Sequence, residues 1–139
     1  MQNMQGGIRY STNSRITVDQ FIDLLRQSSL GDRRPIDDLG RMTGILLNTN
    51  LLVTAWHGRL LVGLARSITD FYFSCYISDL AVRSEYQNIG IGKSLIRLVQ
   101  RSLSPECKLI LIAAPSANSY YKHLGFEQNS RCWTLNRKI

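Results

Sequence analysis

The chain has 139 residues, 44% of them hydrophobic, so it is long enough for one well-packed core and too short for two ordinary domains. Seventeen Lys and Arg residues against ten Asp and Glu give a formal charge of +7, which favours anionic partners such as nucleic acid, an acidic membrane surface or a phosphorylated cofactor. No stretch approaches the roughly 18 apolar residues that span a bilayer, and the three cysteines lack the spacing of a disulfide framework or zinc site. We therefore expect one domain over residues 1–139, in the cytoplasm and without membrane contact.

The first fifty residues are predicted to form one short strand and two helices. Residues Ile8–Tyr10 are a candidate first strand. Thr17 with Gln20 three residues later is a capping-box signature, and apolar residues recur at helical spacing over residues 18–25. After a polar break, residues 36–47 again carry one apolar face, with two aspartates in the first turn, where the helix dipole favours negative charge.

From Leu51 the sequence becomes rich in β-branched and aromatic residues. Three such runs cover residues 51–56, 59–68 and 71–82. The dipeptides between them, His57-Gly58 and Thr69-Asp70, have turn character, so the runs predict three antiparallel strands.

The second half is predicted to alternate helices and strands. The expected elements are a helix over residues 91–99, an apolar strand of the buried kind over 109–113, a helix over 116–124 and one or two closing strands over 126–136. This order indicates an α/β or α+β fold with a mixed sheet. A right-handed crossover would place the strand that ends at Val82 beside the strand that starts at Leu109.

The stretch QNIGIGKSL, residues 87–95, joins a strand to a helix through a glycine-rich turn. A nucleotide-binding P-loop would need glycine at Gln87, and a dinucleotide fingerprint would need glycine at Leu95, so both motifs fail. What remains is Gln87 followed by Gly90 and Gly92 at the start of a helix. There, successive backbone N–H groups and the helix N-terminus can converge on an anion.

Two spaced motifs make the sequence similar to the GCN5-related N-acetyltransferases, the GNAT superfamily. The first, V-x(4)-[QR]-x-x-G-x-[GA], is matched at Val82, Gln87, Gly90 and Gly92. The second, A-x-x-[FY]-Y-x-x-x-G-F, is matched at Ala117, Tyr120, Tyr121, Gly125 and Phe126. They occur in the family's order, with a short apolar strand between them.

The resemblance implies a mixed, mostly antiparallel sheet of six to seven strands flanked by about four helices. It also implies an acetyl-CoA-dependent N-acetyltransferase that moves the acetyl group directly from the thioester to a primary amine of a small molecule or peptide. No metal is expected, and a homodimer is compatible with the family. The alternative is a non-catalytic acyl-CoA-binding or sensing module. Nucleic acid is not expected as a partner, because the basic residues are scattered without interleaved aromatic residues.

The resemblance assigns cofactor contacts to two segments. The backbone of Leu80, Ala81 and Val82 is expected to pair with the pantetheine arm like an added strand. The turn expected to hold the phosphates comprises Gln87, Asn88, Ile89, Gly90, Ile91, Gly92, Lys93 and Ser94. Asn118 is expected to contact the cofactor arm.

The catalytic assignments also follow from the resemblance. Tyr121 matches the family's general acid, whose phenol protonates the departing thiolate and so also lies at the cofactor. Asp79, just before the cofactor-pairing residues, is the candidate general base. The turn that carries Arg33 and Arg34 is expected to border the acceptor site. The two histidines lack the partners of a catalytic triad or metal cluster.

Overall fold

One five-stranded sheet organises the chain. In this computed structural model, which describes residues 4–137, the strands are β1 (Ile8–Ser11), β2 (Leu51–His57), β3 (Leu60–Thr69), β4 (Ser74–Val82) and β5 (Lys108–Leu111). The helices are α1 (Val18–Arg26), α2 (Leu39–Leu47), α3 (Ile91–Arg101) and α4 (Asn118–His123). Short 3-10 turns lie at Met4–Gly7, Gly31–Arg33, Ser84–Tyr86 and Pro115–Ala117. Among the described residues, no helix is both long enough and apolar enough to cross a membrane.

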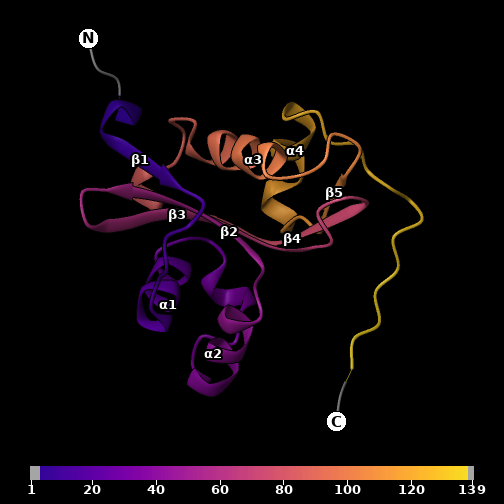
Figure 1. Cartoon of the computed structure of the whole chain (residues 1–139). Helices are drawn as coiled ribbons and strands as arrows, with labels where there is room; N and C mark the ends of the chain where they lie inside the picture. The colour runs from indigo at the N-terminus through magenta and orange to yellow at the C-terminus, as the bar shows by residue number, and fades with distance from the viewer. Residues whose placement is uncertain (1–3, 138–139) are drawn as a thin grey trace.

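The strands follow one another in the order β1-β2-β3-β4-β5. The first four are antiparallel, whereas β5 runs parallel to β4. Helices α1 and α2 cover one face of the sheet, and α3 and α4 lie on the other (Figure 1). The predicted mixed sheet, the four helices and the placement of the strand that ends at Val82 beside the strand that starts near Leu109 are therefore confirmed.

Two apolar cores hold the layers together. One lies between the sheet and α3, where Leu95 and Val99 are fully buried. The other lies between the sheet and the first two helices, around Phe21 and Met42. Gly63 on β3 permits the close approach of α3, because a Cβ there would lie 3.2 Å from a methyl group of Leu95.

The capping box of the first helix is confirmed, whereas the second helix starts at Leu39 and not at residue 36, so the two aspartates precede its first turn. In the capping box, the Gln20 backbone N–H donates to the Thr17 hydroxyl at 3.0 Å and the Thr17 N–H donates to the Gln20 side chain at 2.8 Å. The second helix begins after Asp38, whose carboxylate accepts from the Arg41 N–H at 3.0 Å. The helix expected over residues 116–124 is instead a 3-10 turn followed by the short α4.

The predicted six to seven strands are wrong, because the closing strands over residues 126–136 do not form. The C-terminal tail (residues 127–137) is exposed and pairs with no strand of the described chain. The prediction of a buried strand over 109–113 is also wrong: β5 is an edge strand, and Ile110 keeps 41% of its surface exposed. Strand propensity in a sequence becomes a strand only where another strand satisfies its backbone hydrogen bonds.

A buried ion cluster joins the sheet to the segment between α1 and α2. The two carboxylate oxygens of Asp79 accept hydrogen bonds from Arg34 Nε at 2.6 Å and from Arg66 Nε at 2.5 Å. The Asp79 side chain has no exposed surface, and that of Arg66 is only 7% exposed. We call this group the Arg34–Asp79–Arg66 cluster. It fixes the segment before α2 against β4.

We predict that Asp79→Asn lowers the free energy of unfolding by about 3–5 kcal/mol, because it leaves the Arg66 guanidinium buried without a counter-ion. The measurement is urea unfolding followed by circular dichroism. The matched control is Asp37→Asn, whose carboxylate is 98% exposed and 4.0 Å from Arg26, and which should not change stability measurably. Equal effects of the two substitutions would contradict the structural role of the cluster.

Candidate active site

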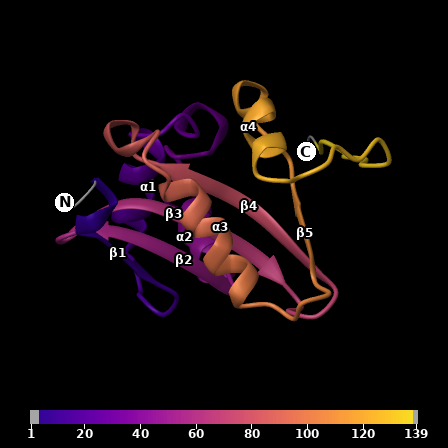
Figure 2. The same ribbon diagram turned by 90° about the horizontal axis from the view of Figure 1, so that it is seen from above.

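The site lies where β4 and β5 stop pairing. The two strands are matched only from Ser74 opposite Lys108 to Ile77 opposite Leu111. Beyond this point β4 continues along β3 to Val82, while the chain after β5 turns away towards α4, so the strands diverge (Figure 2). The side of β4 that faces β5 therefore has no strand partner from Ser78 onward.

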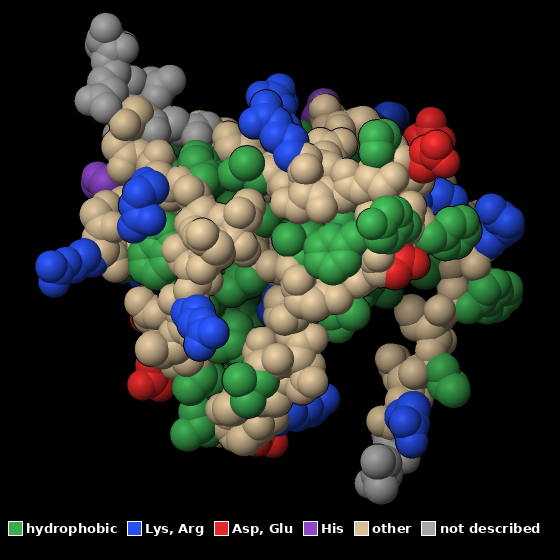
Figure 3. Space-filling model, viewed as in Figure 1, with side chains coloured by type: hydrophobic (Ala, Val, Ile, Leu, Met, Phe, Trp, Pro, Cys, Tyr) green, Lys and Arg blue, Asp and Glu red, His purple; other side chains and the backbone are tan. Residues whose placement is uncertain are grey.

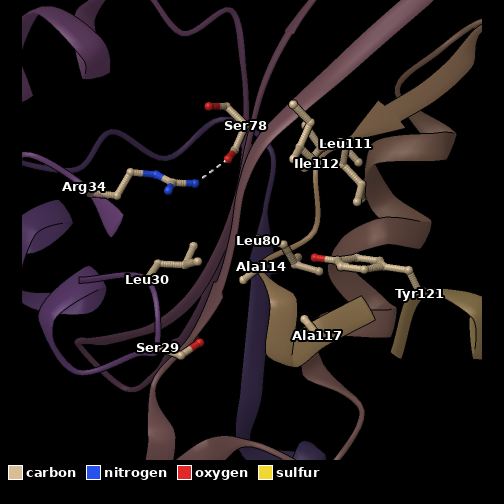
Figure 4. A pocket seen from close by; sticks show the side chains of 11 residues that line it. Ser29, Leu30, Arg34, Ser78, Leu80, Leu111, Ile112, Ala114, Ala117 and Tyr121 are labelled. Atoms are coloured by element: carbon tan, nitrogen blue, oxygen red, sulfur yellow. Dashed lines mark hydrogen bonds between the residues drawn. The ribbon is translucent and has the colours of Figure 1, made fainter. Parts of the chain in front are cut away.

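A small pocket of ≈ 50 Å³ opens at this divergence. Its walls come from β4, the end of β5, the segment between α1 and α2, and the start of α4. The lining residues are Ser29, Leu30, Arg34, Ile77, Ser78, Leu80, Leu111, Ile112, Ala114, Ala117 and Tyr121. Arg34 reaches it from one side and Tyr121 from the other (Figure 4).

Tyr121 presents a protonated phenol to the pocket. Burial, with a smaller contribution from neighbouring Tyr120, raises the pKa of Tyr121 to about 12. Its ring packs edge-on against Tyr120 at 5.4 Å and Phe126 at 5.6 Å between centroids. Its hydroxyl points towards Leu80 and Ala114 (Figure 4). At neutral pH this group keeps its proton and can donate it or a hydrogen bond, as a general acid must.

The turn after β4 is held in a special backbone conformation. Asn88 and Gly90 adopt left-handed φ values of 66° and 94°. The Gln87 side-chain amide donates to the Val82 carbonyl oxygen at 3.0 Å, so this residue fastens the turn to the end of β4. That contact gives Gln87 a positioning role that the sequence did not indicate.

Helix α3 begins directly after this turn, and its N-terminus is suited to bind a phosphate. This helix has no side-chain cap and no acidic residue in its first turn, where Lys93 lies exposed. Its first N–H groups therefore find no anionic partner within the helix start. The residues present fit the phosphates of coenzyme A.

Two residues of this helix start also have packing roles. A Cβ on Gly92 would overlap the Tyr120 hydroxyl oxygen, so glycine here lets the Tyr120 side chain reach α3. Ser94 hydrogen-bonds Tyr10, whose pKa is nevertheless raised, because burial outweighs that bond.

The structure does not bring every predicted residue to the pocket. Asp79 is absent from the lining, fully buried and bound by two guanidinium groups, so we do not retain it as general base. Asn118 is exposed outside the lining, and its side-chain oxygen accepts from Gln128 at 3.4 Å. Of Arg33 and Arg34, only Arg34 lines the pocket.

Ser29 and Leu30 belong to the turn between the first two helices that was expected to border the acceptor site, whereas Ser78 and Ile112 were not predicted, because they carry no local motif. Within residues 4–137 there is no group of three or more His, Cys, Asp or Glu side chains able to hold a metal ion.

Comparison with known sequences identifies relatives along most of the chain. A family profile described as an acetyltransferase (GNAT) domain matches residues 39–132. An N-acetyltransferase of Prochlorococcus marinus named ycf52-like is 33% identical over 133 residues, which cover 90% of this chain and 68% of that protein. The N-acetyltransferase ycf52 of Pyropia yezoensis is 40% identical over 68 residues, which span 48% of this chain and 39% of the relative. The match thus covers about two thirds of the first relative and less than half of the second.

Comparison with solved structures shows the same fold. A GNAT-family acetyltransferase from Streptococcus pneumoniae aligns with a TM-score of 0.75 at 22% identity, over 94% of this chain and 99% of that one. The aminoglycoside N-acetyltransferase AAC(6')-Iy in complex with CoA aligns with a TM-score of 0.66 at 18% identity, over 95% and 94%. Together with the profile match across most of the chain, these similarities show that the protein belongs to the GNAT family of N-acetyltransferases.

Proposed function

We propose that residues 1–139 act as one domain that transfers the acetyl group of acetyl-CoA directly to a primary amine. The observation that carries this proposal is the convergence of three features at one place. These are the unpaired side of β4, the uncapped start of α3 and the buried phenol of Tyr121. Each matches one requirement of the reaction: a held thioester, a bound phosphate and a proton for the thiolate.

Cofactor binding is proposed for the backbone rather than for charged side chains. The unpaired side of β4 at Leu80–Val82 can pair with the pantetheine arm as an added strand. The N–H groups of the turn and helix start over residues 87–94 can bind the phosphates. When bound, acetyl-CoA supplies an activated thioester, and a CoA complex of a protein with this fold supports the choice.

In the proposed reaction the amine nitrogen bonds to the carbonyl carbon while the carbon–sulfur bond breaks. Tyr121 gives a proton, or a strong hydrogen bond, to the sulfur that leaves. The nitrogen loses one proton, and the phenol recovers its proton from solvent, so the step balances. No side chain needs to become acetylated.

Deprotonation of the amine has no obvious carboxylate base. Neither Asp nor Glu lines the pocket, and the Arg34–Asp79–Arg66 cluster carries two positive charges against one negative. This excess positive charge disfavours a bound ammonium ion and favours the neutral amine. We therefore propose that the acceptor reacts as the neutral amine, which loses its proton to solvent.

Tyr121→Phe should lower kcat about 100-fold or more and leave the Kd for acetyl-CoA within a few-fold, because it removes the acid and keeps the ring packing. Released thiol measures turnover and calorimetry measures binding. The control is Tyr72→Phe. The Tyr72 ring is 76% exposed at the β3–β4 turn, so this substitution should change neither kcat nor the Kd for acetyl-CoA. An unchanged kcat would reject Tyr121 as the acid. Acetyl-CoA binding without thiol release for any amine would identify a binding module instead.

The pH dependence of kcat/KM should be set by the pKa of the acceptor amine. Below the pKa of the acceptor amine, kcat/KM should rise about tenfold per pH unit, as the neutral fraction does. Tyr121, with its pKa of about 12, stays protonated over this range, so its ionisation does not change the pH profile of kcat/KM. Measuring two acceptors of different amine pKa tests this. A midpoint that stays at the same pH for both would reveal a base on the enzyme.

We propose that the protein also forms a homodimer. Ile68, Tyr76 and Ile110 lie side by side across β3, β4 and β5, and they are 51%, 38% and 41% exposed. The tail adds Trp133 and Leu135, 90% and 86% exposed. Several hydrophobic side chains lie at the surface on the side from which the tail leaves (Figure 3). A second copy would cover this row and supply its own tail to the unpaired edge of β5.

Light scattering should therefore give a mass of about twice 15.8 kDa. Ile110→Glu should shift it to the monomer mass, because a buried charge in the interface is costly. Leu60→Glu, equally exposed at 41% but at the opposite end of β3 from Ile68, is the control. A wild-type protein that stays monomeric at high concentration would contradict the dimer.

The remaining partner and compartment assignments stay predictions. A cytoplasmic location is proposed from the cysteine usage, although one relative is a chloroplastic N-acetyltransferase of Arabidopsis thaliana. Nucleic acid remains an unexpected partner, since charge alone motivates it.

A further inference from the structure

The Arg34–Asp79–Arg66 cluster leaves one positive charge uncompensated. Asp79 is the one carboxylate that pairs with either arginine within the described residues. The other hydrogen-bond partners of Arg66 are neutral hydroxyl groups of Thr49 and Ser78. A partly buried excess charge is unfavourable unless an anion or water reaches it.

Arg34 is the member of the cluster that a ligand can reach. Its side chain is 24% exposed and lines the pocket, whereas Asp79 has no exposed surface. Its guanidinium donates from Nε to Asp79, from Nη1 to the Arg33 carbonyl and from Nη2 to the Ser78 carbonyl. A guanidinium has five N–H donors, so one on each terminal nitrogen remains. Such a pair of donors suits a carboxylate.

The rest of the pocket offers no site for a second positive charge. Its polar side chains besides Arg34 are hydroxyl groups of Ser29, Ser78 and Tyr121, and the remaining lining is apolar. An amine with several positive charges would find no counter-ion here and would be repelled by Arg34. An amine that also carries a carboxylate would neutralise the excess charge.

We propose that the natural acceptor is an amine that bears a carboxylate, and that Arg34 is the residue that selects it. This inference rests on the proposed acetyl transfer and names the class of acceptor for the same pocket. The apolar walls formed by Leu30, Leu80 and Ile112 favour an acceptor with an apolar body between these polar groups. The carboxylate belongs either to a free amino acid or to an acidic side chain of a peptide.

Matched pairs of acceptors test the inference on the wild-type enzyme. Leucine is compared with 3-methylbutylamine, and phenylalanine with phenethylamine, as kcat/KM per neutral amine. A carboxylate bound by Arg34 should give the amino acid an advantage of about 10- to 100-fold. A second arm compares short peptides with a free N-terminus and either Glu or Gln at the second residue. Preference in the first arm alone identifies free amino acids, and preference for Glu in the second identifies acidic peptides.

The variant Arg34→Gln should abolish the advantage. The ratio of kcat/KM for the carboxylate-bearing acceptor to kcat/KM for its plain amine should fall to about one, chiefly through a higher KM for the carboxylate-bearing acceptor. Arg33→Gln removes the same charge from the neighbouring exposed residue outside the pocket lining and should keep the preference. Thermal unfolding checks that both variants are folded.

Two results would overturn the inference. One is equal or better use of the plain amines by the wild-type enzyme together with equal use of the Glu and Gln peptides, which leaves the acetyltransferase activity intact and removes only the carboxylate preference. The other is a preference for carboxylates that Arg34→Gln leaves unchanged. Absence of thiol release with every amine would instead contradict the proposed acetyltransferase function, so failure of the carboxylate preference and failure of the proposed function can be told apart.

Discussion

The early end of the pairing between β4 and β5 is the constraint on which the site depends. The strands are matched over four residue pairs, and then β4 stays with β3 while the chain after β5 crosses to α4. A sheet that stayed paired would have satisfied the β4 backbone and left no opening. The divergence exposes that backbone and brings Tyr121 opposite it. One interruption therefore provides both the proposed place for a thioester and the proposed acid beside it.

The two sides of this opening are supported by different forces. On the Tyr121 side, apolar packing dominates: α4 rests on α3 where Gly92 lets Tyr120 approach, and burial keeps the phenol of Tyr121 protonated. On the Arg34 side, the buried carboxylate of Asp79 holds the segment before α2. Because buried charges bind only with good geometry, this side is rigid as well as positive. Asp79 thus fixes the position of Arg34 without neutralising both arginines that it binds.

The sequence allowed most of the sheet order to be predicted, because the turns and periodicities are local. The capping box at Thr17 and the crossover from β4 to β5 follow from neighbouring residues and handedness alone. The closing strands could not be predicted, since Trp133 and Leu135 have strand character but no partner within the described chain. Tertiary partners decide whether such a segment becomes a strand.

The candidate site divides in the same way. The residues proposed for the cofactor could be predicted as one group because they are contiguous, in the end of β4 and the turn into α3, and their role stays a prediction. Asp79 shows the limit of the sequence: a carboxylate on β4 looked like a base, and only the fold shows that arginines from two other segments reach it. Two residues of the glycine motif also have structural roles, since Gln87 fastens the turn and Gly92 admits Tyr120. A match to this motif therefore indicates packing contacts as well as the proposed cofactor binding. The proposed acceptor site includes Arg34, which lies outside the motif. Its chemistry follows only from the residues that the fold brings together in the pocket.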